Sequence, residues 1–133
     1  MSTSAQYAST PKVGSALLTT GDTSLTTPST FGTVLTAGSN GSRIDYIKVN
    51  GVATTSTAII NLFIYDGSTY SLWQQIPVTA VTSSITNLAF TYTLSSNSNA
   101  DVMPLTLPTG YSLRATVTQT QTGIRVLAYG GDF

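Results

Sequence analysis

The chain has 133 residues with no cysteine and no histidine, and five Lys and Arg residues balance five Asp residues to a net charge of zero. Charged residues make up 8% of the chain, against about 25% in typical soluble domains. Such a chain has no basic field to neutralise phosphates, which argues against direct nucleic-acid binding, and no thiolate for disulfides or metal sites.

Short segments rich in β-branched and aromatic residues alternate with turn signals along the chain. In chain order, strands are predicted over residues 15–20, 31–37, 42–49, 58–65, 70–76, 86–94, 101–107, 111–117 and 123–129. Residues 1–14 are small and polar and contain Pro11, so we expect an N-terminal arm that is disordered on its own. Within 42–49, Ile44 and Ile47 fall on opposite faces, which predicts either a bulge or burial on both sides of the strand.

The most apolar segment, residues 58–65, leads through Asp66-Gly67 into residues 70–76. Asp-Gly is a strong hairpin signal because glycine adopts the positive φ of a tight turn without steric cost. We expect the first arm to be a central strand and Pro77 to end the second. Period two places on the core face Ala58, Ile60, Leu62 and Ile64, and on a semi-polar second face Ile59, Asn61, Phe63 and Tyr65.

The later strands alternate more clearly. The residues predicted to face the core are Leu88, Phe90, Tyr92, Leu94, Met103, Leu105, Leu107, Leu113, Ala115, Val117, Ile124, Val126 and Ala128. The last two strands are predicted to pair as a closing hairpin across residues 118–122. Arg114 and Arg125 would then face outward side by side and repel each other unless an acidic partner lies between them.

Short strands at regular spacing, with no helical period over a useful length, predict an all-β fold. We expect a single β-sandwich or jelly-roll-like domain of about eight to nine antiparallel strands over residues 15–133, preceded by the arm 1–14. No apolar run reaches the length of about 18 residues expected of a membrane span. The first residues lack the pattern of a signal peptide, so synthesis in a cytoplasm is expected if Met1 is the native start.

Histidine and glutamate are both absent, so the usual general base and a Ser-His-Asp triad are missing. The five aspartates are Asp22, Asp45, Asp66, Asp101 and Asp132. A glycosidase would need two carboxylates across a cleft. Asp22 and Asp66, however, lie beside turn glycines, where aspartate is common because its side chain bonds to the backbone of the turn. We therefore expect no catalytic residue, no metal site, no cofactor and no enzymatic activity.

Aromatic side chains anchor interfaces and bind sugars, so Trp73 and the tyrosines are the remaining candidates. Two interpretations of Trp73 stay open: it points outward if Leu72, Gln74 and Ile76 point inward, or it caps the core at one end of the sandwich. The residues predicted to form a protein interface are Tyr7, Lys12, Phe63, Tyr65, Trp73, Arg114, Arg125 and Phe133.

Four motifs carry a family resemblance. An I-x-x-I-x-V strand, Ile44 to Val49, precedes the apolar strand that ends in Asp66-Gly67. An L-P-x-G-x-x-L-x-A hairpin entry, Leu107 to Ala115, precedes a closing V-x-A-x-G-G strand, Val126 to Gly131. Over residues 43–131 the chain resembles a small β-sandwich module of tailed-bacteriophage structural proteins.

This resemblance implies a virion protein, most like a capsid decoration (cement) protein that fastens neighbouring major capsid subunits. It implies the major capsid protein as partner, a homo-oligomer with a trimer favoured over a dimer, and a place on the capsid surface after synthesis in the host cytoplasm. An arm ordered on binding would suit that role, so removing residues 1–14 is expected to weaken capsid binding and leave the fold intact. The alternatives are a tail, baseplate or head-fibre component, or a carbohydrate-binding or adhesion module.

Overall fold

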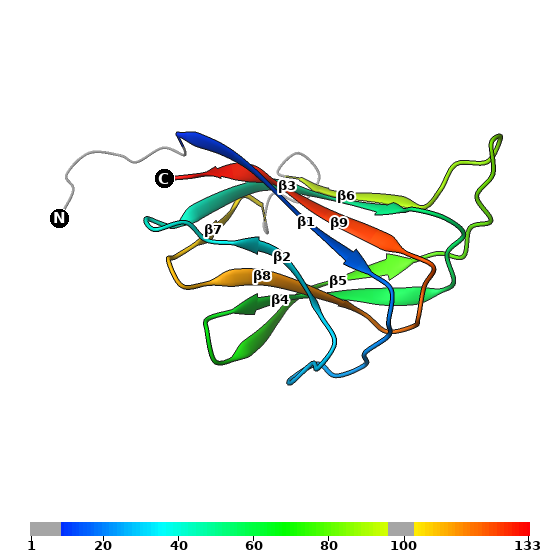
Figure 1. Cartoon of the computed structure of the whole chain (residues 1–133), viewed down its shortest axis with the longest axis horizontal. Coiled ribbons are helices and arrows are strands. Elements are labelled where there is room, and N and C mark those ends of the chain that lie inside the picture. Colours follow the sequence, from blue (N-terminus) through cyan, green and yellow to red (C-terminus); the bar gives the residue numbers. More distant parts are fainter. Residues whose placement is uncertain (1–8, 96–102) are drawn as a thin grey trace.

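The computed structural model of the protein describes residues 9–95 and 103–133 (Figure 1). These residues form nine strands and no helix, which confirms the predicted all-β fold. The strands are β1 (Thr10–Leu18), β2 (Gly32–Thr36), β3 (Ser42–Gly51), β4 (Ala58–Tyr65), β5 (Tyr70–Val78), β6 (Thr91–Ser95), β7 (Leu105–Leu107), β8 (Ser112–Val117) and β9 (Ile124–Asp132). No described segment is a helix long and apolar enough to cross a membrane.

The strands form two packed sheets, which Figure 1 shows as an upper and a lower layer. Sheet I has the order β1-β9-β3-β6, with β7 also paired to β3, and sheet II has the order β2-β8-β4-β5. Apart from the β4–β5 hairpin and the β6–β7 link, consecutive strands lie in different sheets. This alternation between two antiparallel sheets is the strand order of a jelly roll.

The core lies between the sheets and is built from alternate residues of each strand. The predicted central hairpin is confirmed: β4 lies between β8 and β5, and Gly67 has a φ of +103° at the turn. The inward positions predicted for the last two strands are likewise confirmed. The fully buried residues include Ile44, Ile47, Val49, Ile60, Leu62, Leu113, Ala115, Val117, Ile124, Val126 and Ala128.

Bulges adjust this alternation in three of the described strands. The predicted bulge in β3 is confirmed at Asp45, where the pairing with β9 shifts, so that Ile44 and Ile47 are both buried. The bulges at Val34 in β2 and Trp73 in β5 were not predicted. An extra residue reverses the faces beyond it. Leu72 is exposed, so the inward orientation expected for it is wrong. Trp73 packs against the core, which excludes the outward interpretation of its side chain and agrees with the second one.

The predicted boundary between arm and domain is also wrong, because β1 begins at Thr10 rather than at residue 15. Residues 10–14 pair with Ala128 to Asp132 of β9. They look like an arm in the sequence because β1 is an edge strand, where a polar outer face and a proline are tolerated. Residues 1–8 lie outside the described residues, as do residues 96–102, which include Asp101 and the start of the predicted strand 101–107.

Three further expectations are corrected. β8 and β9 do not form a closing hairpin, because β8 lies in sheet II and β9 in sheet I, so Arg114 and Arg125 do not face each other. β5 continues through Pro77 to Val78, since an edge strand loses no ladder bond on its free side. The predicted strand 86–94 is shortened to Thr91–Ser95, and Leu88 is exposed rather than inward.

Candidate functional site

Loops gather at the end of the sandwich where β1, β5 and β8 finish, and buried polar side chains fix their bases (Figure 1). The Gln121 side-chain amide accepts a hydrogen bond from the Ser56 backbone N–H at 2.9 Å and donates one to the Ser56 carbonyl at 3.0 Å. Thr55 Oγ1 donates to the Thr79 carbonyl at 2.8 Å. These bonds fix the loops where they leave the sheets.

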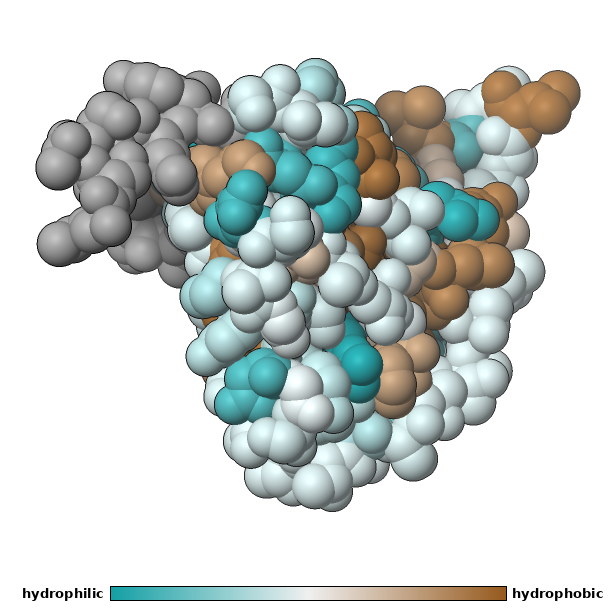
Figure 2. All heavy atoms as spheres, turned by 60° about the vertical axis from the view of Figure 1, so that its left-hand side comes forward, coloured by the Kyte–Doolittle hydropathy of each residue, from teal (hydrophilic) through white to brown (hydrophobic). Residues whose placement is uncertain are grey.

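An apolar tip, defined here as Ile85 and Leu88, projects from the 79–90 loop. The relative exposures of these side chains are 104% and 88%. A turn shapes the tip: the Ser84 backbone N–H donates to the Asn87 carbonyl, and the Asn87 backbone N–H donates to Ser84 Oγ, both at 3.0 Å. Figure 2 shows hydrophobic side chains on the projection at the upper right of the molecule. Two large aliphatic side chains exposed to this degree on one turn are the kind of surface that a partner covers.

An aromatic–arginine cluster covers the outer face of sheet II. The Arg114 guanidinium lies between the rings of Phe31 and Tyr65, 4.3 Å and 3.8 Å from their centroids. Arg114 Nη1 donates to the Tyr70 hydroxyl at 2.5 Å, and Tyr70 packs edge-on against Phe63 at 5.7 Å. Cation–π contacts of this kind fix the planar guanidinium, and they screen Phe63 from solvent although it points away from the main core.

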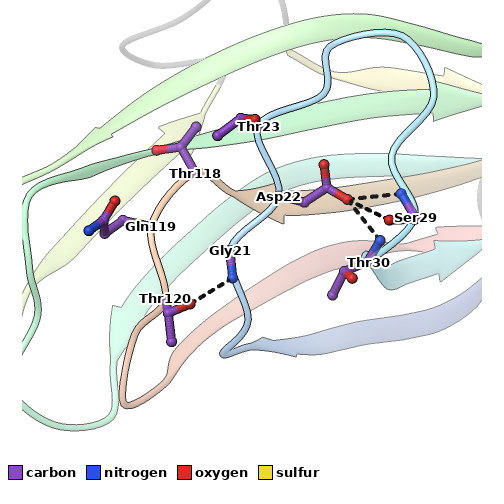
Figure 3. Close-up of a pocket in the computed structure, with 8 residues that line it drawn as sticks. All are labelled: Gly21, Asp22, Thr23, Ser29, Thr30, Thr118, Gln119 and Thr120. Carbon is purple, nitrogen blue, oxygen red and sulfur yellow. Dashed lines mark hydrogen bonds between the residues drawn. The ribbon is translucent and has the colours of Figure 1, made fainter.

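A polar hollow, the third feature, lies between the 19–31 loop and the segment after β8 (Figure 3). Its volume is about 450 Å³, and its lining residues are Gly21, Asp22, Thr23, Ser29, Thr30, Thr118, Gln119 and Thr120. The Asp22 carboxylate accepts hydrogen bonds from the backbone N–H groups of Thr30, Ser24 and Ser29 at 2.8–2.9 Å. These bonds, that of Thr30 foremost, hold the pKa of Asp22 below its usual value.

The structure brings together only part of the predicted interface. Phe63, Tyr65 and Arg114 meet in the aromatic–arginine cluster, but Phe63 is fully buried and supports that surface from beneath. Trp73 packs against the core, and Arg125 lies on β9 in sheet I. Tyr7 lies outside the described residues.

Lys12 and Phe133 lie toward the opposite end of the sandwich. Lys12 Nζ donates to the Thr36 carbonyl at 2.6 Å and pairs with the Asp132 carboxylate at 3.1 Å. Ser42 Oγ also bonds Asp132, and the hydrogen bonds from Ser42 and Lys12 lower the pKa of Asp132. The Phe133 backbone N–H donates to the Gly41 carbonyl. Lys12 therefore links β1 to β2 and β9, and Phe133 links the end of β9 to the turn before β3.

Sequence reasoning missed the apolar tip and two residues of the aromatic–arginine cluster, Phe31 and Tyr70. The alternation from Leu88 to Leu94 predicted an inward Leu88, and Ile85 had no periodic signal because it lies among Ser and Thr. Phe31 and Tyr70 precede or begin their strands, and only the strand pairing places them beside Arg114. The two aspartates assigned to turns do cap turns: Asp66 Oδ1 accepts from the Ser68 and Thr69 N–H groups.

The described residues contain no group of three His, Cys, Asp or Glu side chains that could hold a metal ion. No protein-family model and no curated protein matches the chain.

Proposed function

We propose that the protein is a non-enzymatic structural subunit that attaches to a larger protein assembly through its apolar tip. The observation that carries this proposal is the exposure of Ile85 and Leu88 at 104% and 88% on a loop whose base is fixed. Covering one such aliphatic side chain stabilises a complex by about 1.5–3 kcal/mol. A pair of them on a projecting loop suits insertion into an apolar recess of a partner.

The assembly that we propose is the capsid of a tailed bacteriophage, which the chain would decorate by bridging neighbouring major capsid subunits. The motif resemblance supports this partner, and jelly rolls occur in viral capsid proteins, although that second point is an analogy of fold alone. Zero net charge favours association over mutual repulsion. A homo-oligomer, with a trimer preferred, belongs to the same proposal.

The test measures binding of the purified protein to capsids assembled without it, by sedimentation of the particles and cryo-electron microscopy. We expect the wild-type protein to saturate sites at capsomer junctions. Replacing both tip residues, Ile85→Ser and Leu88→Ser, is expected to weaken binding by at least about 100-fold, the equivalent of about 3 kcal/mol. The fold should survive because neither side chain packs in the core.

The matched control is Val13→Thr, which removes apolar surface from an exposed β1 residue of sheet I and keeps a β-branched side chain. It should bind as the wild type does. Equal binding by the tip variant and the control would contradict docking through the tip. Density on the tail alone would indicate a tail or baseplate component instead of a capsid decoration protein. The absence of density on the particle would overturn the proposal.

A further inference from the structure

The polar hollow is separate from the apolar tip and has the features of a small-ligand site. Its volume of about 450 Å³ falls within the range of about 300–1,000 Å³ found for such sites. Its walls come from two segments far apart in the chain, the 19–31 loop and residues 118–120, which Figure 3 shows side by side. The fold thus creates a concave surface that neither segment forms alone.

Internal hydrogen bonds build the walls before any ligand arrives. Asp22 Oδ2 holds Ser29 and Thr30 in place through their backbone N–H groups. Thr120 Oγ1 accepts from the Gly21 backbone N–H at 3.1 Å and so joins the two segments. A preorganised site loses less conformational entropy on binding than a loop that must order itself.

The lining consists of groups that bond to hydroxyls. Apart from Gly21, each lining residue carries a hydroxyl, an amide or a carboxylate. Thr23 and Gln119 are exposed at the rim, and Gln119 offers both an amide donor and an acceptor. Such a lining matches a ligand that carries many hydroxyl groups, each able to donate and accept.

A second, smaller cavity adjoins these walls and places an aromatic ring beside them. Its volume is about 160 Å³, it shares Thr30 with the hollow, and it is lined by Phe31, Leu17 and Leu18 together with four threonines. Phe31 is 40% exposed, and its contact with Arg114 fixes the ring. Sugar rings have apolar C–H faces and a rim of hydroxyls, so they need this combination of a fixed aromatic ring and polar groups.

The charge of the hollow selects among saccharides. Among the residues that line it, Asp22 carries the charge, and an aspartate whose pKa is at or below its ordinary value is ionised at neutral pH. A carboxylate in the wall repels an anionic ligand. We propose that the polar hollow, extended by the cavity beside Phe31, binds a neutral saccharide, a function that goes beyond attachment to a capsid.

The experiment titrates the full chain, without capsids, with lactose, cellotriose, diacetylchitobiose and sialyllactose, by calorimetry and ligand-observed NMR. We expect at least one neutral sugar to bind, and sialyllactose to bind more weakly than lactose. Gln119→Ala and Thr23→Ala should each weaken that binding about fivefold, the equivalent of one hydrogen bond. Thr93→Ala, an exposed threonine on β6 of sheet I, is the matched control and should leave binding unchanged.

Three outcomes would overturn this inference: no neutral sugar binds at millimolar concentration, both hollow variants bind as the control does, or sialyllactose binds as tightly as lactose. Gln119 and Thr23 make no described hydrogen bond to the rest of the fold, so loss of binding in these variants would report the hollow rather than misfolding. Because capsids are absent, a negative result leaves capsid attachment standing.

Discussion

At the scale of single residues, Arg114 joins the aromatic side chains on the outer face of sheet II. Its guanidinium contacts two rings at 4.3 Å and 3.8 Å and donates to Tyr70. We expect Arg114→Ala to lower the free energy of unfolding by about 2–4 kcal/mol, because it removes the cation–π contacts with Phe31, Tyr65 and Tyr70 and uncovers Phe63. Denaturant unfolding followed by tyrosine and tryptophan fluorescence measures this loss.

Two comparison variants make this prediction specific. Arg114→Lys keeps the charge but not the planar guanidinium that stacks on the rings. It should lower the free energy of unfolding by about half as much as Arg114→Ala does. Arg43→Ala breaks an exposed pair with Asp45, 2.8 Å apart, and should change the free energy of unfolding by less than about 1 kcal/mol. If Arg114→Ala changed the free energy of unfolding as little as Arg43→Ala does, the aromatic–arginine cluster would not stabilise the fold.

At the scale of elements, β1 decides how much of the N-terminus can be removed. A variant that begins at residue 15 loses the pairing of Thr10 to Gly14 with β9 and the bonds of Lys12 to Asp132 and Thr36. Each net hydrogen bond contributes about 0.5–1.5 kcal/mol. We therefore expect this truncation to cost about 2–4 kcal/mol of stability in total, measured by thermal and denaturant unfolding.

A variant that begins at Ser9 is the control, because it keeps β1 whole. It should unfold within about 0.5 kcal/mol of the full chain, and its capsid affinity then reports the contribution of residues 1–8, Tyr7 among them, without a change in the fold. Equal stability of the two truncations would show that the pairing of residues 10–14 with β9 does not stabilise the sandwich.

The elements also show how far the sequence predicts the structure. The hairpin at Asp66-Gly67 and the inward faces of β8 and β9 were predictable, because turn chemistry and period two are local signals. The bulges at Val34 and Trp73 were not, since each depends on the register of a neighbouring strand. For the same reason neither the division of β8 and β9 between sheets nor the meeting of residues 21–30 with 118–120 at the polar hollow could be predicted.

At the scale of the whole molecule, composition determines the response to pH. With no histidine and no glutamate, no side chain has an ordinary pKa between about 5 and 8. The pKa values of Asp22, Asp66 and Asp132 are all lowered, by hydrogen bonds from Thr30, Thr69 and Ser42 foremost. A carboxyl group whose pKa is lower in the folded state than in the unfolded state stabilises the fold above the unfolded value, near about 3.9, and that stability is lost as the pH falls through the folded value.

We therefore expect the thermal midpoint at constant ionic strength to stay level between about pH 8 and pH 5 and to fall below about pH 4. Asp132→Asn should make the acid decline shallower, because this amide keeps the shape of the carboxyl group and does not titrate. The measurement is a series of thermal melts of the wild type and this variant from pH 8 to pH 2. A thermal midpoint that declined steadily from pH 8 to pH 5 would mean that a group other than these aspartates controls the pH dependence of stability. An acid decline in Asp132→Asn as steep as that of the wild type would mean that Asp132 does not contribute to it.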